Sequence, residues 1–445
     1  MKKWMTYVKP YWPYFVIGPL CMIVEVIGEV VMPKLLSVVI NQGNDQTLTV
    51  SGSIGICLAM AGIAVLMMAG GVGGAYFGAK ASVNFAADVR NDVYRKIQGF
   101  AFANIDRFST GSLVTRITND VTQLQNFVNM LLRMALRAPG MLIGGLIMAI
   151  LLKPSLATVF AVSIPLLLII IAAIISVGFP RFQKMQAKID RLNSTVQENI
   201  TNTRVVKSFV REDYEVDKFH KANRDLKDAG LSAMRVVIFL QPVMTFFMYA
   251  TVIAVIWFGH RIVLDGGMAV GDLSAFITYV NQILMSLMMV TFLLMTSSRA
   301  LASARRIREV LDEKPDLSDE NAAQPALPVR DGQVEFRHVS FRYYKNSEDK
   351  VLDNVSLTIQ PRSTVGIIGS TGCGKTTLVS LIPRLYDADE GEVLVDGVNV
   401  RDYSLYHLRE GVGMVLQKNV LFSGTIEENL RWGDPDATQE EIETA

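Results

Sequence analysis

Six long, nearly uncharged apolar runs constrain this chain more than any other feature of its sequence. About 20 apolar residues suffice for a helix to cross the hydrocarbon of a bilayer. So many runs in the first two-thirds of the chain disfavour the alternative that they are buried helices of a soluble protein. The third run is short and must begin near Asn129, and it meets the fourth at Lys153-Pro154, where we expect a tight hairpin. The runs lie near Phe15–Ile40, Ile54–Ala79, Ala138–Leu152, Ser155–Phe179, Val236–Phe258 and Leu273–Ser297.

The distribution of lysine and arginine predicts which ends of these spans face the cytoplasm. Residues 80–137 hold eight Lys and Arg residues and residues 180–235 hold twelve, whereas the opposite side would have Lys34, Lys153 and Arg261. Because positively charged loops stay on the cytoplasmic side, we expect a multi-pass protein of the cytoplasmic membrane with both termini cytoplasmic. Aromatic residues among lysines predict an interfacial helix over residues 1–14.

The two cytoplasmic loops are rich in helix formers and almost free of Pro and Gly. Structureless connections of this length are uncommon in compact domains. We therefore expect spans two to five to continue as helices beyond the bilayer, and to reverse near Asp106–Leu113 and Lys207–Glu215. Residues 15–311 would then form an all-α, six-span domain with long cytoplasmic stalks.

Two sets of side chains within the apolar runs are candidates for a substrate path. Glu25 and Glu29 lie on one face of the first span, where ionisable groups face a cavity or a partner rather than lipid. They would attract cations in a translocation path, or form a structural hydrogen-bonding pair, and the sequence leaves both interpretations open. Met285, Met288 and Met289 of the sixth run would form a soft wall for ligands of varied shape, or would simply pack against neighbouring helices.

A polar linker, residues 312–328, precedes a segment with the pattern of a soluble α/β domain, residues 329–445. The apolar stretch Thr364–Gly369 is expected to be a buried strand that leads into GSTGCGKT, a match to the phosphate-binding loop G-x-x-x-x-G-K-[ST]. Its glycines let backbone amides converge on phosphates at a helix N-terminus. Lys375 would reach the β- and γ-phosphates, Thr376 would bind Mg²⁺, and Thr377 would donate to the α-phosphate. The predicted ATP-binding residues are Gly369, Ser370, Thr371, Gly372, Cys373, Gly374, Lys375, Thr376 and Thr377.

With these features the whole chain resembles one half of an ATP-binding cassette (ABC) exporter. The resemblance includes SLVTRITNDVTQLQ in the first stalk and VLFSGTIEENL near the end, and is strongest to subunits of bacterial heterodimeric multidrug exporters. It implies an incomplete α/β P-loop NTPase domain after the six-span domain. It also implies that Tyr343 stacks on adenine, and that Gln417 contacts Mg²⁺ and relays the nucleotide state as a catalytic residue. The two reversals would be coupling helices that dock on nucleotide domains.

Several elements of the family pattern are missing from these residues. The sequence shows no LSGGQ-like signature, no aspartate-terminated second apolar strand followed by glutamate (the Walker B motif), and no switch histidine. In the family they would follow Ala445, so we expect that this chain alone does not hydrolyse ATP. A fragment of a longer protein is favoured over a natural short form, because a sheet without its central neighbours would expose apolar edges.

The resemblance implies ATP-driven export of small amphipathic or cationic compounds by alternating access. The cofactors would be ATP and Mg²⁺, and the partner a second half-transporter, in a heterodimer rather than a homodimer. Export of a lipid or peptide is an alternative, as is a membrane-anchored nucleotide sensor, which the rigid stalks disfavour. A net charge of +1 gives no indication of a nucleic-acid partner, and the three scattered cysteines show no metal-ligand spacing.

Overall fold

A computed structural model describes residues 2–45, 49–319, 322–344, 348–417 and 420–444. Contacts divide the chain into two compact units, which we call the helical unit (residues 1–92 and 116–308) and the α/β unit (residues 93–115 and 309–445). The tip of the first stalk therefore belongs to the same unit as the phosphate-binding loop. The predicted domain boundaries near residues 15, 312 and 329 stay predictions, and residues 320–321 of the linker lie outside the described part.

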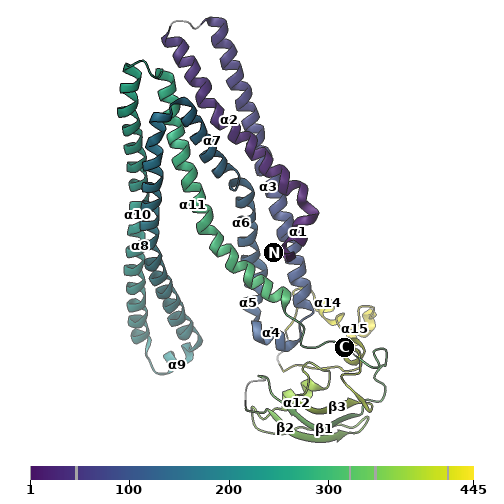
Figure 1. Ribbon diagram of the computed structural model, residues 1–445. Coiled ribbons are helices and arrows are strands. Elements are labelled where there is room, and N and C mark those ends of the chain that lie inside the picture. Colours follow the sequence, from purple (N-terminus) through teal and green to yellow (C-terminus); the bar gives the residue numbers. More distant parts are fainter. Residues whose placement is uncertain (1, 46–48, 320–321, 345–347, 418–419, 445) are drawn as a thin grey trace. The chain divides into compact units, whose positions relative to one another are not determined.

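Among the described residues before 313, helices form all regular structure (Figure 1). They are α1 Lys2–Val8, η1 Lys9–Tyr11, α2 Trp12–Asn44, α3 Val50–Gln98, α4 Phe102–Phe108, α5 Thr110–Thr115, η2 Arg116–Asp120, α6 Val121–Met134, α7 Arg137–Leu152, α8 Pro154–Thr201, α9 Thr203–Ser208, α10 Glu212–Leu264 and α11 Val270–Asp312. The element η2 is a short π-helix, and η1 is a 3-10 helix.

Six helical segments are long and apolar enough to cross a membrane, which agrees with the six predicted spans. They contain 42 to 53 residues each. Since an α-helix rises about 1.5 Å per residue, the single helix α11 of 43 residues is about 65 Å long, roughly twice the thickness of the hydrocarbon. The excess length forms the stalks that the loop composition predicts. The two stalk reversals each contain a non-glycine residue with positive φ, Ser109 (59°) and Val210 (51°).

The third span is assembled from two helices, as its short apolar run requires. α6 ends at Met134 and α7 begins at Arg137, so the span borrows residues before Ala138 as expected. The predicted hairpin after it is also present, since Lys153 is the only residue between α7 and α8. Its ammonium group donates a hydrogen bond to the Gly267 carbonyl oxygen at 2.9 Å.

Glycines let α3 approach α2 closely. A Cβ atom at Gly70 would lie 2.7 Å from the Cys21 carbonyl oxygen, and one at Gly71 would lie 3.3 Å from the carboxylate of Glu25. Small residues at such interfaces let helices approach within backbone contact, which is the main source of packing energy when lipid surrounds both helices. The contact therefore depends on the absence of a side chain at these positions.

A large apolar core joins α7, α8, α10 and α11 in the helical unit. Phe276, Tyr279 and Ile283 of α11 are fully buried in it. Tyr279 also donates a hydrogen bond to the Val30 carbonyl oxygen of α2 at 2.8 Å, which satisfies its hydroxyl in an apolar setting. Near the C-terminal end of α11, Arg306 pairs with the buried carboxylate of Asp120, which also accepts a hydrogen bond from Ser303.

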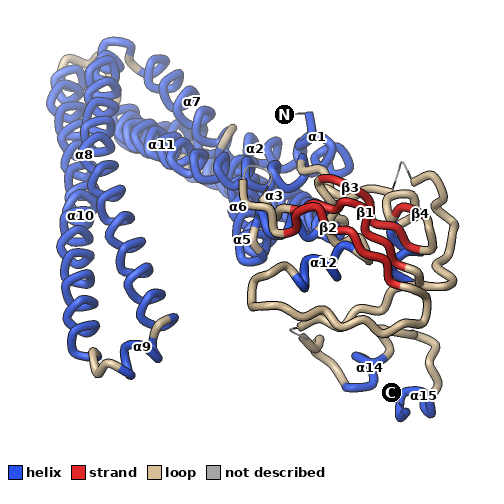
Figure 2. Tube along the Cα trace, turned by 90° about the horizontal axis from the view of Figure 1, so that it is seen from below, coloured by secondary structure: helices blue, strands red, loops and turns tan. Residues whose placement is uncertain are grey.

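In the α/β unit, four antiparallel strands form a sheet in the order β2-β1-β3-β4 (Figure 2). Phe336 and Val339 of β1 and Leu378 and Leu381 of α12 are buried in one core, so the helix after the phosphate-binding loop packs on the sheet. The elements are β1 Val334–Phe341, β2 Leu352–Ile359, α12 Lys375–Leu381, β3 Glu390–Val395, β4 Val398–Asn399, α13 Leu405–Glu410, α14 Ile426–Leu430 and α15 Gln439–Thr444.

The expected buried strand at Thr364–Gly369 is absent, which corrects the sequence prediction. The segment is irregular, and Ile368 is 97% exposed. A central strand needs hydrogen-bonding neighbours on both sides, and no described segment of the chain pairs with these residues. The segment has the apolar composition of a strand, but no described strand lies beside it to form the hydrogen bonds of a sheet.

The α/β unit holds the short helix α4 through one buried side chain. Asn104 is 1% exposed, and its Oδ1 accepts hydrogen bonds from the backbone amides of Ala101 (3.1 Å) and Asp316 (2.9 Å). Its Nδ2 donates to the Lys314 carbonyl oxygen at 3.0 Å and to Glu313 Oε1 at 3.3 Å. Because both ends of the amide are satisfied, the side chain fixes α4 to the segment that follows α11.

The close contact of α2 and α3 gives a testable consequence. Gly70→Ala would force the helices apart and should destabilise the protein by about 1–3 kcal/mol, the usual cost of overpacking. Gly62→Ala is the matched control, because nothing lies within 4 Å of a Cβ there, and alanine favours a helix over glycine. Thermal unfolding in detergent would measure both variants. Equal melting temperatures would contradict the close packing.

Candidate nucleotide-binding site

The loop that matches the phosphate-binding motif contains glycines in conformations that few other residues adopt. Gly372 and Gly374 adopt φ values of +86° and +91°, in the left-handed region that favours glycine. A Cβ at Gly369 would lie 2.5 Å from the Cys373 sulfur, and one at Gly374 would lie 3.0 Å from the Val351 carbonyl oxygen. All three glycines therefore occupy positions where a side chain would distort the loop.

Lys375 is the first residue of α12, and its side chain curls back over the loop. Its Nζ donates hydrogen bonds to the carbonyl oxygens of Gly369 (2.9 Å) and Ser370 (2.7 Å) and lies 3.6 Å from the sulfur of Cys373. The ammonium group is thus held at the centre of the loop. A phosphate bound there would meet a positive charge whose present partners are neutral carbonyl groups.

Two of the predicted nucleotide contacts touch each other. The Tyr343 hydroxyl lies 2.9 Å from the Thr377 hydroxyl, and either group could donate the hydrogen bond. The Tyr343 side chain remains 42% exposed, whereas Thr377 is buried. The structure therefore brings the predicted adenine contact to the helix that follows the phosphate-binding loop.

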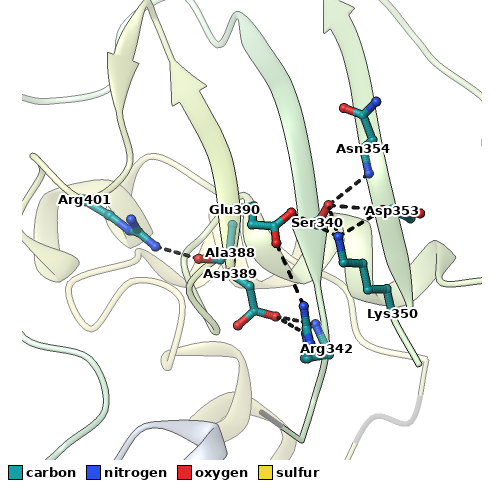
Figure 3. Close-up of polar contacts among 9 residues, drawn as sticks. All are labelled: Ser340, Arg342, Lys350, Asp353, Asn354, Ala388, Asp389, Glu390 and Arg401. Carbon is teal, nitrogen blue, oxygen red and sulfur yellow. Dashed lines mark hydrogen bonds and ion pairs between the residues drawn. The ribbon is translucent and has the colours of Figure 1, made fainter. Parts of the chain in front are cut away.

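Charged side chains fix the backbone next to Tyr343 (Figure 3). The Arg342 amide donates to Asp389 Oδ2 at 2.8 Å, and its guanidinium pairs with the carboxylates of Asp389 (3.4 Å) and Glu390 (4.0 Å). Nearby, the Lys350 ammonium group forms ion pairs with Asp353 (3.2 Å) and Glu390 (3.0 Å). These contacts tie the end of β1 to the start of β3 and set the position from which the tyrosine projects.

Gln417 is exposed on an irregular segment, immediately before two residues outside the description. Its predicted contact with Mg²⁺ therefore stays a prediction, as do the predicted roles of Ser370, Thr371 and Thr376. Among the described residues, no group of three or more His, Cys, Asp or Glu side chains could hold a metal ion. Since Mg²⁺ in nucleotide sites is usually held by phosphates and few protein oxygens, the loop residues fit Mg·ATP better than a free metal ion.

The two carboxylates of the first span share a partner that the sequence prediction missed. Arg137 pairs with Glu25 at 2.9 Å and with Glu29 at 2.5 Å. The three side chains are 15–23% exposed. Arg137 stands directly before the apolar run at Ala138, and its charge suggested a cytoplasmic position. Glu25 lies about 20 Å along α2 from Trp12, well inside the apolar run. Two carboxylates at such a position call for a positively charged partner, and this requirement could have pointed to an arginine on another span.

Two of the three predicted methionines line a small pocket in the helical unit. Its volume is about 50 Å³, and both Met285 and Met288 contribute to its wall. Met289 is half-buried on the same helix, and the described lining of the pocket does not include it. The other lining residues come from α8, α10 and α11 and are Leu167, Gln241, Met244, Thr245, Phe247, Met248 and Leu284.

Comparison with known protein families covers both units. The family model described as ABC transporter transmembrane region matches residues 15–287, and that described as ABC transporter matches residues 352–445. The chain is 36% identical to an uncharacterised ABC transporter ATP-binding protein of Bacillus subtilis, over 99% of this chain and 76% of the relative.

Two further relatives have named substrates. A fatty acid ABC transporter ATP-binding/permease protein of Mycobacterium bovis is 35% identical over 80% of this chain and 55% of the relative. An ATP-dependent lipid A-core flippase of Syntrophus aciditrophicus is 29% identical over 99% of this chain and 72% of the relative.

The position of Cys373 makes the loop open to direct measurement. The thiol is exposed beside Lys375, so maleimide should label it, and bound Mg·ATP should cover it. At an ATP concentration ten times Kd, simple mass action predicts about ten-fold slower labelling. Cys21 and Cys57, within the apolar spans, are the internal controls and should show no protection. Peptide mass spectrometry measures all three, and equal labelling of Cys373 with and without Mg·ATP would contradict nucleotide binding at this loop.

Proposed function

We propose that this chain, which belongs to the ABC transporter family, is one half of an exporter for amphipathic molecules. The family and the fold class agree with the resemblance stated from the sequence, and the chain is a multi-pass membrane protein. ATP would bind at Gly369–Thr377 with Mg²⁺ and drive alternating access of the six spans. The proposal includes cytoplasmic termini, which rest on the lysine and arginine counts.

The methionine-lined pocket is the observation that supports this cargo. Four methionines, Met244, Met248, Met285 and Met288, surround it, and the polar groups in its wall are Gln241 and Thr245. None of the described lining residues carries a formal charge. Flexible, polarisable methionine side chains adapt to apolar groups of different shapes, and two neutral polar groups suit a weakly polar portion of a ligand.

The charged residues of the first span support a structural role better than a cation site. Arg137 already pairs with both Glu25 and Glu29, so a cationic cargo would have to compete with a permanent guanidinium. The two ion pairs join α2 to α7, so they stabilise the packing of these two helices. We therefore base the proposal on the apolar pocket and not on the acidic pair.

Lipid export is the second candidate, and a specific observation favours it. One relative is named as a fatty acid transporter and another as a lipid A-core flippase, and both resemble this chain over most of its length. The end of an acyl chain is a flexible apolar group of the kind that this methionine pocket of about 50 Å³ suits. A nucleotide sensor without transport is not supported by any comparable feature.

The partner in this proposal is a second half-transporter. Around the second reversal, Val205, Phe209 and Val210 are 54%, 72% and 81% exposed. The resemblance predicts that a nucleotide domain docks on this tip, and such a domain would cover these apolar side chains. A heterodimer is favoured over a homodimer on the same resemblance, and the native mass of the purified assembly, with both subunits identified, would decide this point. That this chain alone does not hydrolyse ATP remains part of the proposal.

ATP-dependent uptake of a fluorescent amphiphile into inverted membrane vesicles tests the proposal. Met288→Trp would fill the pocket and exclude the cargo, and should lower the uptake rate about ten-fold, which corresponds to about 1.4 kcal/mol of lost binding. Met289→Trp is the matched control, one residue further along α11 and outside the described lining. Equal uptake by the two variants would show that the cargo does not use this pocket.

The same assay separates the two interpretations of the acidic pair. A triple variant, Glu25→Gln with Glu29→Gln and Arg137→Gln, removes all three charges without leaving one of them unpaired. We expect the ratio of cationic to neutral amphiphile uptake to remain within about two-fold of the original protein, because charges that only join helices do not distinguish between cargos. If the carboxylates bound a cationic cargo, the loss of that ion pair would cost several kcal/mol and change the ratio by much more than two-fold. A selective loss of cationic uptake would instead place the carboxylates in the substrate path.

A further inference from the structure

Tyr343, the predicted contact of the nucleotide base, lies against a second tyrosine that the proposed function does not use. The ring of Tyr386 lies edge-on to that of Tyr343, with centroids 5.3 Å apart and planes at 89°. Phe341 contacts both rings, at 5.0 Å from Tyr343 and 5.6 Å from Tyr386. Edge-to-face contacts have a preferred orientation, so a rotation of one ring disturbs the other.

The opposite end of Tyr386 reaches the short helix α4. Its hydroxyl donates a hydrogen bond to Asp106 Oδ2 at 2.9 Å, and its ring lies 6.0 Å from that of Phe102. Burial, and the hydrogen bond to the Asp106 carboxylate, raise the pKa of Tyr386 far above the usual range for tyrosine. The phenol therefore keeps its proton at neutral pH and remains the donor.

The surroundings of this contact are fixed on both sides. Asn104 anchors α4 to residues 313–316, and Arg107 adds an ion pair with Glu313 at 2.9 Å. Asp389, three residues after Tyr386, holds the backbone of Arg342 beside Tyr343 (Figure 3). The two rings and the Asp106 hydrogen bond thus lie between two backbone segments of the α/β unit that other contacts hold in place.

The Tyr343 side chain is 42% exposed, so a nucleotide base can reach it. Its hydroxyl can donate a hydrogen bond to the Thr377 hydroxyl, which accepts it while its own proton remains available to the α-phosphate. Phosphates alone would therefore leave this hydrogen bond in place, whereas an adenine base would stack on the Tyr343 ring and act on the ring that contacts Tyr386.

We propose that Tyr386 is a positioning residue that transmits the presence of a nucleotide base at Tyr343 to α4 through its hydrogen bond with Asp106. This inference rests on the proposed binding of ATP at Gly369–Thr377 and adds the route by which the base, rather than the phosphates, is detected. Adenine would turn Tyr343, the edge-on contact would move Tyr386, and the hydrogen bond would shift α4. Tyr386 itself touches neither the base nor the phosphates in this account.

Hydrogen exchange of residues 101–109 in the complete protein tests this route, because the amides of Ile105 and Ser109 report the opening of α4. Mg·ATP should change their exchange rates, whereas Mg·tripolyphosphate, which lacks a base, should leave them unchanged. A hydrogen bond to a charged group is strong enough for a change of about ten-fold in a local opening equilibrium. In Tyr386→Phe the ATP-dependent change should disappear, while the Kd for Mg·ATP stays within about two-fold, since the lost bond lies outside the nucleotide contacts.

Two variants of Asp106 serve as matched controls. Asp106→Asn keeps an oxygen that accepts from Tyr386 and should retain the ATP-dependent change, whereas Asp106→Ala should abolish it. A change caused equally by Mg·tripolyphosphate, or one that persists in Tyr386→Phe or Asp106→Ala, would overturn the inference. Failure of the original protein to bind Mg·ATP would overturn the proposed function instead, and binding is measured separately.

Discussion

The hydrocarbon of the bilayer is the constraint on which the rest of this structure depends. Without water, each backbone polar group of a span must pair inside its own helix, so the chain has to cross as continuous helices. The helical segments here are 42–53 residues long, far more than a crossing needs. Their excess length carries the chain reversals beyond the bilayer, to α4 with α5 and to α9. The positions of the reversals therefore follow from the length of the helices, and a force on a reversal would act on the spans that it connects.

The nucleotide site and the first reversal share one compact unit, and this arrangement has a mechanistic consequence. Asn104 fixes α4 to the segment after α11, and Tyr386 joins α4 to the aromatic residues beside the phosphate-binding loop. In the proposed function the glycines and Lys375 would bind the phosphate chain, and Tyr343 would contact the base. Two parts of the same ligand would thus act on two different groups of the protein, and the second group contacts Tyr386, which reaches α4.

The sequence predicted what local composition determines and failed where partners are distant. Apolar runs, positive charges and the phosphate-loop motif are local, so the spans, the stalks and the turn at Lys153 agree with the structure. The prediction of a strand at Thr364–Gly369 was wrong, because apolar composition does not show which neighbouring strands will pair with the segment. Arg137 was missed because its partners, Glu25 and Glu29, stand more than a hundred residues earlier. The contact of Tyr343 with Thr377 required two segments to fold together, which no spacing rule reveals.

The central claim is that a nucleotide at Gly369–Thr377 moves the stalks of the membrane helices. The most direct measurement places spin labels at Gly111 and Ser208, one at each reversal, in the complete protein in its membrane, and compares their distance distribution with and without Mg·ATP. Both positions are exposed. The account predicts a shifted distribution with Mg·ATP and no shift in Lys375→Ala, which lacks the charge that faces the phosphates. Identical distributions in the unmutated protein, or an unchanged shift in Lys375→Ala, would contradict it.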